Sequence, residues 1–157
     1  MKAIDIDFDY LLFAYQDDSP DNIYYLDTEY GSIRLVHSQL KDLRDLTDEI
    51  EIYHDRFLYV PKTTKEEVLD DLRDFMGSVA DGDLKRMLAV AFESPLVLDS
   101  CRKIVAKNLP VRQQLETYLQ DKAKERLLTW LAANALTVAQ NNNQGKLEDK
   151  LEEKLEE

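Results

Sequence analysis

Apolar and polar residues follow two different periods along the chain, and the period of two occurs only in its first third. Residues 22–27 (NIYYLD) and 32–37 (SIRLVH) are typical of two strands, and residues 28–31 would form the turn between them. Gly31 suits that turn, because glycine adopts a positive φ at little cost. Residues 57–60 (FLYV) predict a third strand. A small antiparallel sheet is therefore expected in the N-terminal third.

Helical spacing dominates the remainder. Asp7 is expected to cap a helix over residues 8–16, whereas residues 40–46 form a short amphipathic helix at best. Thr64 and Glu67 have the spacing of a capping box. The helices expected in the second half cover residues 65–79, 83–92, 95–105 (capped by Ser94, with Pro95 in the first position) and 110–134.

These elements predict an α+β fold, with the small antiparallel sheet in the N-terminal third and a helical C-terminal half. No alternation of strands and helices is visible, which argues against a doubly wound sheet. We expect one domain over residues 1–136, a polar linker over 137–145 and a charged helical tail over 146–157. Within the domain, residues 1–62 would bear the sheet and residues 63–136 would be helical.

Composition narrows the class of protein. A chain of 157 residues that is 44% apolar can bury a core, and its 33% charged residues are mixed in sign. One cysteine cannot form an internal disulfide, which suits a reducing compartment. No signal peptide or membrane-spanning run is visible, so we expect a cytoplasmic protein that does not contact a membrane.

The net charge of −12 is unevenly distributed. Residues 1–60 contain 14 Asp and Glu against 5 Lys and Arg, whereas residues 61–140 contain 12 of each. Within that neutral region, residues 85–126 have 9 basic and 5 acidic residues. Such polarity steers charged partners over long range, although a low pI disfavours broad nucleic-acid binding.

Two groups of residues are candidates for binding. Basic side chains gather around Pro110 in the sequence. They could contact phosphate, nucleic acid or an acidic partner, or could pair with the chain's own acids. They are Arg102, Lys103, Lys107 and Arg112, followed by Lys122, Lys124 and Arg126. The expected hairpin has Tyr24, Tyr25 and Tyr30, of which half are expected in the core. The others could offer an aromatic contact patch, since tyrosine is enriched at interfaces.

Candidates for chemistry are fewer. Asp5 and Asp7 follow a short apolar run, as at the start of aspartate-nucleophile phosphatases, but no βα repeat follows and a capped helix start is the alternative. His37 and His54 have no metal-ligand spacing to Cys101, which we expect to be a buried, inert thiol. Five carboxylates on one helix could hold a divalent cation or form a solvated acidic face; they are Glu66, Glu67, Asp70, Asp71 and Asp74.

No phosphate-binding loop, dinucleotide fingerprint, nucleophile elbow, zinc motif or redox motif occurs in the sequence. We therefore expect no cofactor, no bound metal and no catalytic residue.

The order of segments resembles a family of small bacterial proteins catalogued as an uncharacterised protein family. The resemblance covers about residues 6–136 and rests on residues 25–31 (YLDTEYG), 57–61 (FLYVP), 72–76 (LRDFM) and 123–131 (AKERLLTWL). It implies no activity and no catalytic residues.

Three functions remain open at this point. The first is a non-enzymatic protein-interaction or regulatory module, the second a protein linked to nucleic acid by basic contact or acidic mimicry. The third is a metal-dependent hydrolase that uses Asp5 and Asp7 or the acidic helix.

Overall fold

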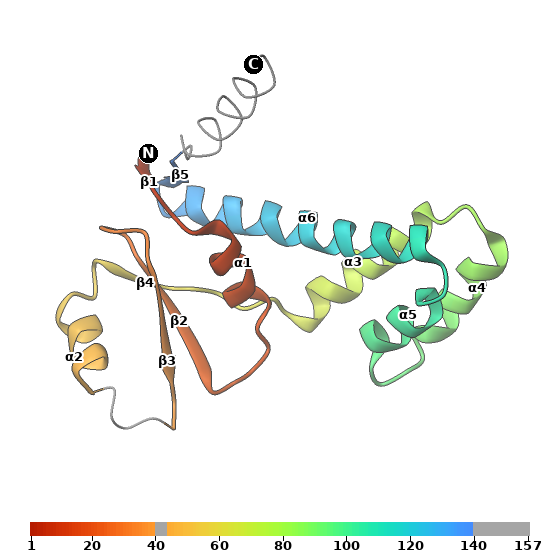
Figure 1. Cartoon of the computed structure of the whole chain (residues 1–157), viewed down its shortest axis with the longest axis horizontal. Coiled ribbons are helices and arrows are strands. Elements are labelled where there is room, and N and C mark those ends of the chain that lie inside the picture. Colours follow the sequence, from red (N-terminus) through yellow and green to blue (C-terminus); the bar gives the residue numbers. More distant parts are fainter. Residues whose placement is uncertain (40–43, 140–157) are drawn as a thin grey trace, which may run out of the picture. The chain divides into compact units, whose positions relative to one another are not determined.

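The computed structural model describes residues 1–39 and 44–139, with the side chains of 44–46 excepted. Its helices are α1 (Phe8–Gln16), α2 (Arg44–Ile52), α3 (Lys65–Ser78), α4 (Gly82–Ala91), α5 (Val97–Val105) and α6 (Leu109–Ala133). Its strands are β1 (Lys2–Ile4), β2 (Asn22–Asp27), β3 (Ile33–His37), β4 (Phe57–Tyr59) and β5 (Leu136–Val138) (Figure 1). The predicted α+β class is confirmed.

The chain forms two compact units, and two of the boundaries between them fall within α1 and α6. Among the described residues, the sheet unit contains 1–14, 19–39, 44–60 and 129–139. The helical unit contains residues 15–18 and 61–128.

In the sheet unit, β2 lies between β3 and β4 and is antiparallel to both. The predicted hairpin is confirmed, with Leu26 opposite Ile33 and a positive φ of 77° at Gly31. The alternation along β2 places Tyr24 and Leu26 in the core, at 2% and 0% exposure. The sheet is thus anchored by one apolar face.

An ion pair joins the end of β2 to the start of β4. Asp27 is fully buried and accepts hydrogen bonds from Nε and Nη2 of Arg56, at 2.8 and 2.7 Å. The backbone amides of Glu29 and Tyr30 also donate to its Oδ1 atom, at 2.9 and 3.2 Å. The carbonyl of Arg56 in turn accepts from the amide and the hydroxyl of Thr28. Because these bonds satisfy both charged groups, they hold the turn against β4.

The strand β5 is not expected from the sequence, which places residues 137–145 in a polar linker. Leu136 and Val138 pair in parallel with Lys2 and Ile4, and the amide of Ala139 donates to the carbonyl of Ile4 at 2.7 Å. Each strand has three residues, too few to show a period, and the partner lies at the opposite end of the chain. The rest of the expected linker and the tail lie outside the described residues.

Several helix boundaries also differ from expectation. Helix α2 begins at Arg44 and continues to Ile52, beyond the expected residues 40–46, of which 40–43 are not described. Asp81 caps α4, so that helix starts before the expected Asp83.

Ser94 does not cap α5, which begins at Val97 without a side-chain cap. The Ser94 hydroxyl instead accepts from the Leu96 amide at 3.2 Å and from the Ser100 hydroxyl at 2.8 Å. The predicted caps at Asp7 and at Thr64 with Glu67 are confirmed.

The core of the helical unit is a single apolar cluster from four helices. Its members are Leu72, Phe75, Leu84, Leu88, Ala91, Val97, Cys101, Val105, Leu115 and Leu119. The buried stripe of α6 continues at a spacing of four residues to Leu131. At 3.6 residues per turn, each such step rotates the buried position by roughly 40°. The stripe therefore winds around α6, and its two ends bury different faces of the helix.

A second buried ion pair lies in the helical unit. Asp71 is 4% exposed and accepts from Nη1 and Nη2 of Arg126, at 2.7 and 2.6 Å. Arg126 also pairs through Nε with Glu67 at 3.0 Å, and Glu67 accepts from the Tyr15 hydroxyl at 3.0 Å. The alternative of a solvated acidic face on α3 is therefore wrong for Asp71 and Glu67, because apolar packing brings Arg126 over them.

The same network shifts two pKa values. Burial raises the pKa of Glu67, but its bonds from Thr64, Tyr15 and Arg126 outweigh burial and leave the pKa below the ordinary 4.5. Burial, together with the bond to Glu67, raises the pKa of Tyr15 above 10.0.

Replacing Gly31 by alanine should destabilise the protein. A Cβ atom there would lie 2.0 Å from the carbonyl oxygen of Asp5, and the positive φ disfavours any side chain. We expect a loss of at least ~2 kcal/mol in urea denaturation followed by circular dichroism. Gly77→Ala is the matched control, because its Cβ would meet no atom within 4 Å and helical alanine stabilises by roughly 0.5–1 kcal/mol. Equal effects of both substitutions would contradict the close approach at Gly31.

Because of Asp27, the stability of the folded protein should decrease as the pH falls into the acid range. The hydrogen bonds from Arg56, aided by the amides of Glu29 and Tyr30, hold the pKa of Asp27 below its ordinary 3.8. A lowered folded pKa contributes stability that is full above pH 3.8 and is lost as the pH falls through the folded value. Asp27→Asn should therefore have a lower melting temperature than wild type at neutral pH. The difference between the two melting temperatures should decrease in acid.

The control for this titration is Asp55→Asn, since the Asp55 side chain is 96% exposed. Its melting temperature should follow that of wild type throughout. If the difference in melting temperature between Asp27→Asn and wild type stays constant down to strong acid, the charge of Asp27 is not what stabilises the turn.

Candidate functional site

The connection between α5 and α6 brings most of the predicted basic residues to one end of the helical unit. Helix α5 ends at Val105, and Asn108 caps α6 by accepting from the Val111 amide at 3.3 Å. Burial of Val105 and Leu115 fixes the two helices beside this short connection. The basic side chains lie on the outer faces, because the apolar positions face the core.

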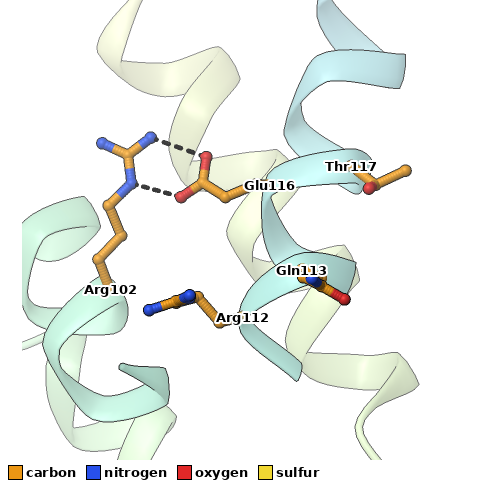
Figure 2. Close-up of a pocket in the computed structure, with 5 residues that line it drawn as sticks. All are labelled: Arg102, Arg112, Gln113, Glu116 and Thr117. Atoms are coloured by element: carbon orange, nitrogen blue, oxygen red, sulfur yellow. Dashed lines mark hydrogen bonds and ion pairs between the residues drawn. The ribbon is translucent and has the colours of Figure 1, made fainter. Parts of the chain in front are cut away.

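An open cavity of about 610 Å³ lies between these helices. It is lined by Arg102 from α5 and by Arg112, Gln113, Glu116 and Thr117 from α6. Figure 2 shows Arg112 extending from α6 toward the α5 side, below the guanidinium group of Arg102. The structure thus brings two of the four predicted residues together in one cavity, while Lys103 and Lys107 do not line it.

Arg102 is already paired. Its Nε and Nη2 atoms donate to the two carboxylate oxygens of Glu116, at 2.8 and 3.2 Å (Figure 2). Both side chains are nearly half exposed, so this pair contributes little to stability. Its main effect is to neutralise Arg102 and hold its guanidinium in place at the rim of the cavity.

The other three basic residues are exposed and have no ion-pair partner among the described residues. Within residues 1–39 and 44–139, Lys103, Lys107 and Arg112 form no ion pair and no side-chain hydrogen bond. We refer to these three residues, with the exposed Leu109 between them in sequence, as the basic surface. The surface has free cationic donors, which suit carboxylate or phosphate groups.

Two of the three later basic residues are paired, and the third lies farther along α6. Lys122 pairs with Glu125 at 3.5 Å and lies over the Tyr118 ring. Arg126 is committed to Asp71. Lys124 is exposed, on the middle of α6.

The tyrosine patch is only partly available. Tyr24 is 2% exposed and packs edge-on against Tyr10, so its prediction as a binding residue is wrong. Tyr25 is half-buried and contacts Tyr59 with ring centroids 6.0 Å apart. Tyr30 is 68% exposed, and the guanidinium of Arg56 lies 4.8 Å from its ring centre. Alternation along β2 explains Tyr24, whose side chain points to the core face.

The candidates for chemistry are occupied or isolated. Asp7 caps α1, and the exposed His54 lies 3.3 Å from Asp55. His37 accepts from the Gln39 amide through Nδ1. In the described part of the chain, no group of three His, Cys, Asp or Glu residues is placed to hold a metal ion.

The two buried ion pairs are features that the sequence analysis missed. Asp27 and Arg56 are separated by 29 residues, and Asp71 and Arg126 by 55. No periodicity couples residues so far apart. The one local signal is a charged residue at the end of the apolar strand β2.

Among the described residues, no helix has both the length and the apolar character to cross a membrane. The chain matches the model of the Uncharacterised protein family (UPF0158) over residues 1–155. No curated protein and no solved structure matches it significantly.

Cys101 should be unreactive in the folded protein. It is 2% exposed in the helical core, and burial raises the pKa of its thiol above 9.0. We expect negligible labelling by a disulfide reagent under native conditions and one thiol equivalent after unfolding. An added cysteine at the exposed Ala80 should label at once in the same assay. Rapid native labelling of Cys101 would contradict the packing of α5.

Proposed function

Since the chain belongs to the Uncharacterised protein family (UPF0158), we propose its function from its own surface. We propose that it is a non-enzymatic protein-interaction or regulatory module, and that its basic surface binds an acidic surface of a partner protein. The observation that supports this most is the set of exposed, unpaired cations Lys103, Lys107 and Arg112 within the described part of an otherwise acidic chain.

The chemistry of this surface favours carboxylates. Arg112 reaches into an open cavity, and a planar guanidinium can bind a carboxylate through two parallel hydrogen bonds. Leu109 is 51% exposed and adds an apolar contact beside the cations. Charges in such a patch act chiefly on association rate and specificity.

A nucleic acid is a weaker candidate for the same surface. Affinity for nucleic acid depends on the number of phosphates neutralised, and three free cations neutralise few. The net charge of −12 repels a polyanion at long range. The hydrolase alternative has less support, because Asp7 caps a helix and Asp71 is buried against Arg126.

Charge reversal tests the proposal. In a pull-down from native lysate, Lys103→Glu/Lys107→Glu/Arg112→Glu should lose the proteins that wild type retains, by tenfold or more. Wild type should release them as salt rises, since exposed charges are screened.

The matched control is Lys65→Glu/Lys85→Glu/Lys124→Glu, which changes the net charge equally at exposed sites elsewhere in the helical unit. It should retain the partners. Loss with both variants would indicate only an effect of net charge, and unchanged capture by the first variant would remove the basic surface as the binding site. The nucleic-acid alternative would be favoured if wild type bound duplex DNA or single-stranded RNA at physiological salt and only Lys103→Glu/Lys107→Glu/Arg112→Glu lost that binding.

A further inference from the structure

The outer face of α2 is the acidic counterpart of the basic surface. Asp48, Glu51 and Ile52 have the i, i+3 and i+4 spacing that places them on one side of the helix. Ile52 is 69% exposed, so this side of the helix has an apolar side chain beside its carboxylates. Asp48 and Glu51 are exposed and have no ion pair or hydrogen bond with any described side chain.

The opposite side of α2 holds the helix in the sheet unit. Ile50 is buried, and Glu49 lies 3.9 Å from Arg34 of β3. Four residues after Glu51 in the chain, the 96% exposed Asp55 adds a third carboxylate, and its ion pair among the described residues is with His54. We refer to Asp48, Glu51, Ile52 and Asp55 as the acidic face. The preceding Arg44 and Asp45 cancel in formal charge, and their side chains are not described.

The acidic face and the basic surface have matching chemistry. One has three exposed carboxylates and the exposed Ile52 within eight residues of chain, and the other has three exposed cations and the exposed Leu109 within ten. The lysine and arginine side chains described in the sheet unit are engaged elsewhere: Lys2 donates to the Thr28 carbonyl, Arg34 pairs with Glu49, and Arg56 pairs with Asp27. Each surface therefore presents one sign of charge beside one large aliphatic side chain.

We infer that the acidic partner of the basic surface is the acidic face of a second copy of this chain. This inference rests on the proposed function and names its partner. Lys103, Lys107 and Arg112 would pair with Asp48, Glu51 and Asp55 of the other copy, and Leu109 would pack on Ile52. Each copy has both surfaces, so the contact would join two different surfaces of two identical chains.

The association should be weak and reversible. Exposed ion pairs are individually weak, and the net charge of −12 on each copy opposes their approach. At physiological ionic strength the screening length is about 8 Å, which reduces the long-range repulsion more than the attraction between groups in contact. We therefore expect a dissociation constant in the micromolar range or above.

Sedimentation velocity over a concentration series of the full chain tests this inference. Wild type should associate reversibly. The base-reversed variant Lys103→Glu/Lys107→Glu/Arg112→Glu and the acid-reversed variant Asp48→Lys/Glu51→Lys/Asp55→Lys should each associate at least tenfold more weakly. The control Lys65→Glu/Lys85→Glu/Lys124→Glu should associate like wild type.

An equimolar mixture of the two reversed variants is the decisive measurement. Mixing places the new acids of one variant opposite the new bases of the other, and the native surfaces opposite each other as well. Association should therefore return to within a few fold of wild type, which misfolded variants could not achieve. Equal melting temperatures of the separate variants provide the folding control.

Two results would overturn the inference: wild type that stays monomeric throughout the series, or a mixture that does not associate. The proposed function fails separately. If the partner is another protein, the base-reversed variant loses it in the pull-down, while the acid-reversed variant retains it and the chain remains monomeric. If neither variant changes the pull-down, the proposed function itself is wrong.

Discussion

Neutralisation of a buried carboxylate is the interaction on which each unit depends. Among the described residues, the buried charged side chains are Asp27 and Asp71, one in each unit. Each is bound through both oxygens by an arginine from a distant segment, Arg56 in the sheet unit and Arg126 in the helical unit. An unpaired carboxylate in either place would lose its hydration without compensation. In the helical unit, removing one partner of such a pair costs roughly 3–5 kcal/mol.

These pairs also shape the electrostatics of the surface. Arg56 and Arg126 are used internally, and Arg102 is held by Glu116. Within the described part of the chain, Lys103, Lys107 and Arg112 stay exposed and take no part in these internal ion pairs. The basic residues of the sequence thus fall into two groups. One group forms ion pairs within the fold, and the other is available for binding and is the basis of the proposed interaction module.

Local features explain why much of the fold could be predicted. The period of two over β2 and β3, the glycine turn at Gly31 and the capping box at Thr64 each involve neighbouring residues. The start of α5 was missed because Ser94, although a good capping residue, bonds to Ser100 instead. The acidic stripe of α3 was misjudged for Asp71 because spacing alone does not reveal which face another helix covers.

By itself, the sequence determined the α+β class, most helices, the central hairpin and the burial of Cys101, since these follow from short-range periodicity and side-chain preference. Tertiary structure alone decided the pairing of β1 with β5, the partners of Asp27 and Asp71, the burial of Tyr24 and the exposure of Arg112 in an open cavity. The physical reason is that all of these depend on contacts between residues distant in the chain. Whether a charge is buried and paired or exposed is a property of the packed structure. Here it separates Arg56 and Arg126, which hold the fold, from Lys103, Lys107 and Arg112, which are exposed to a partner.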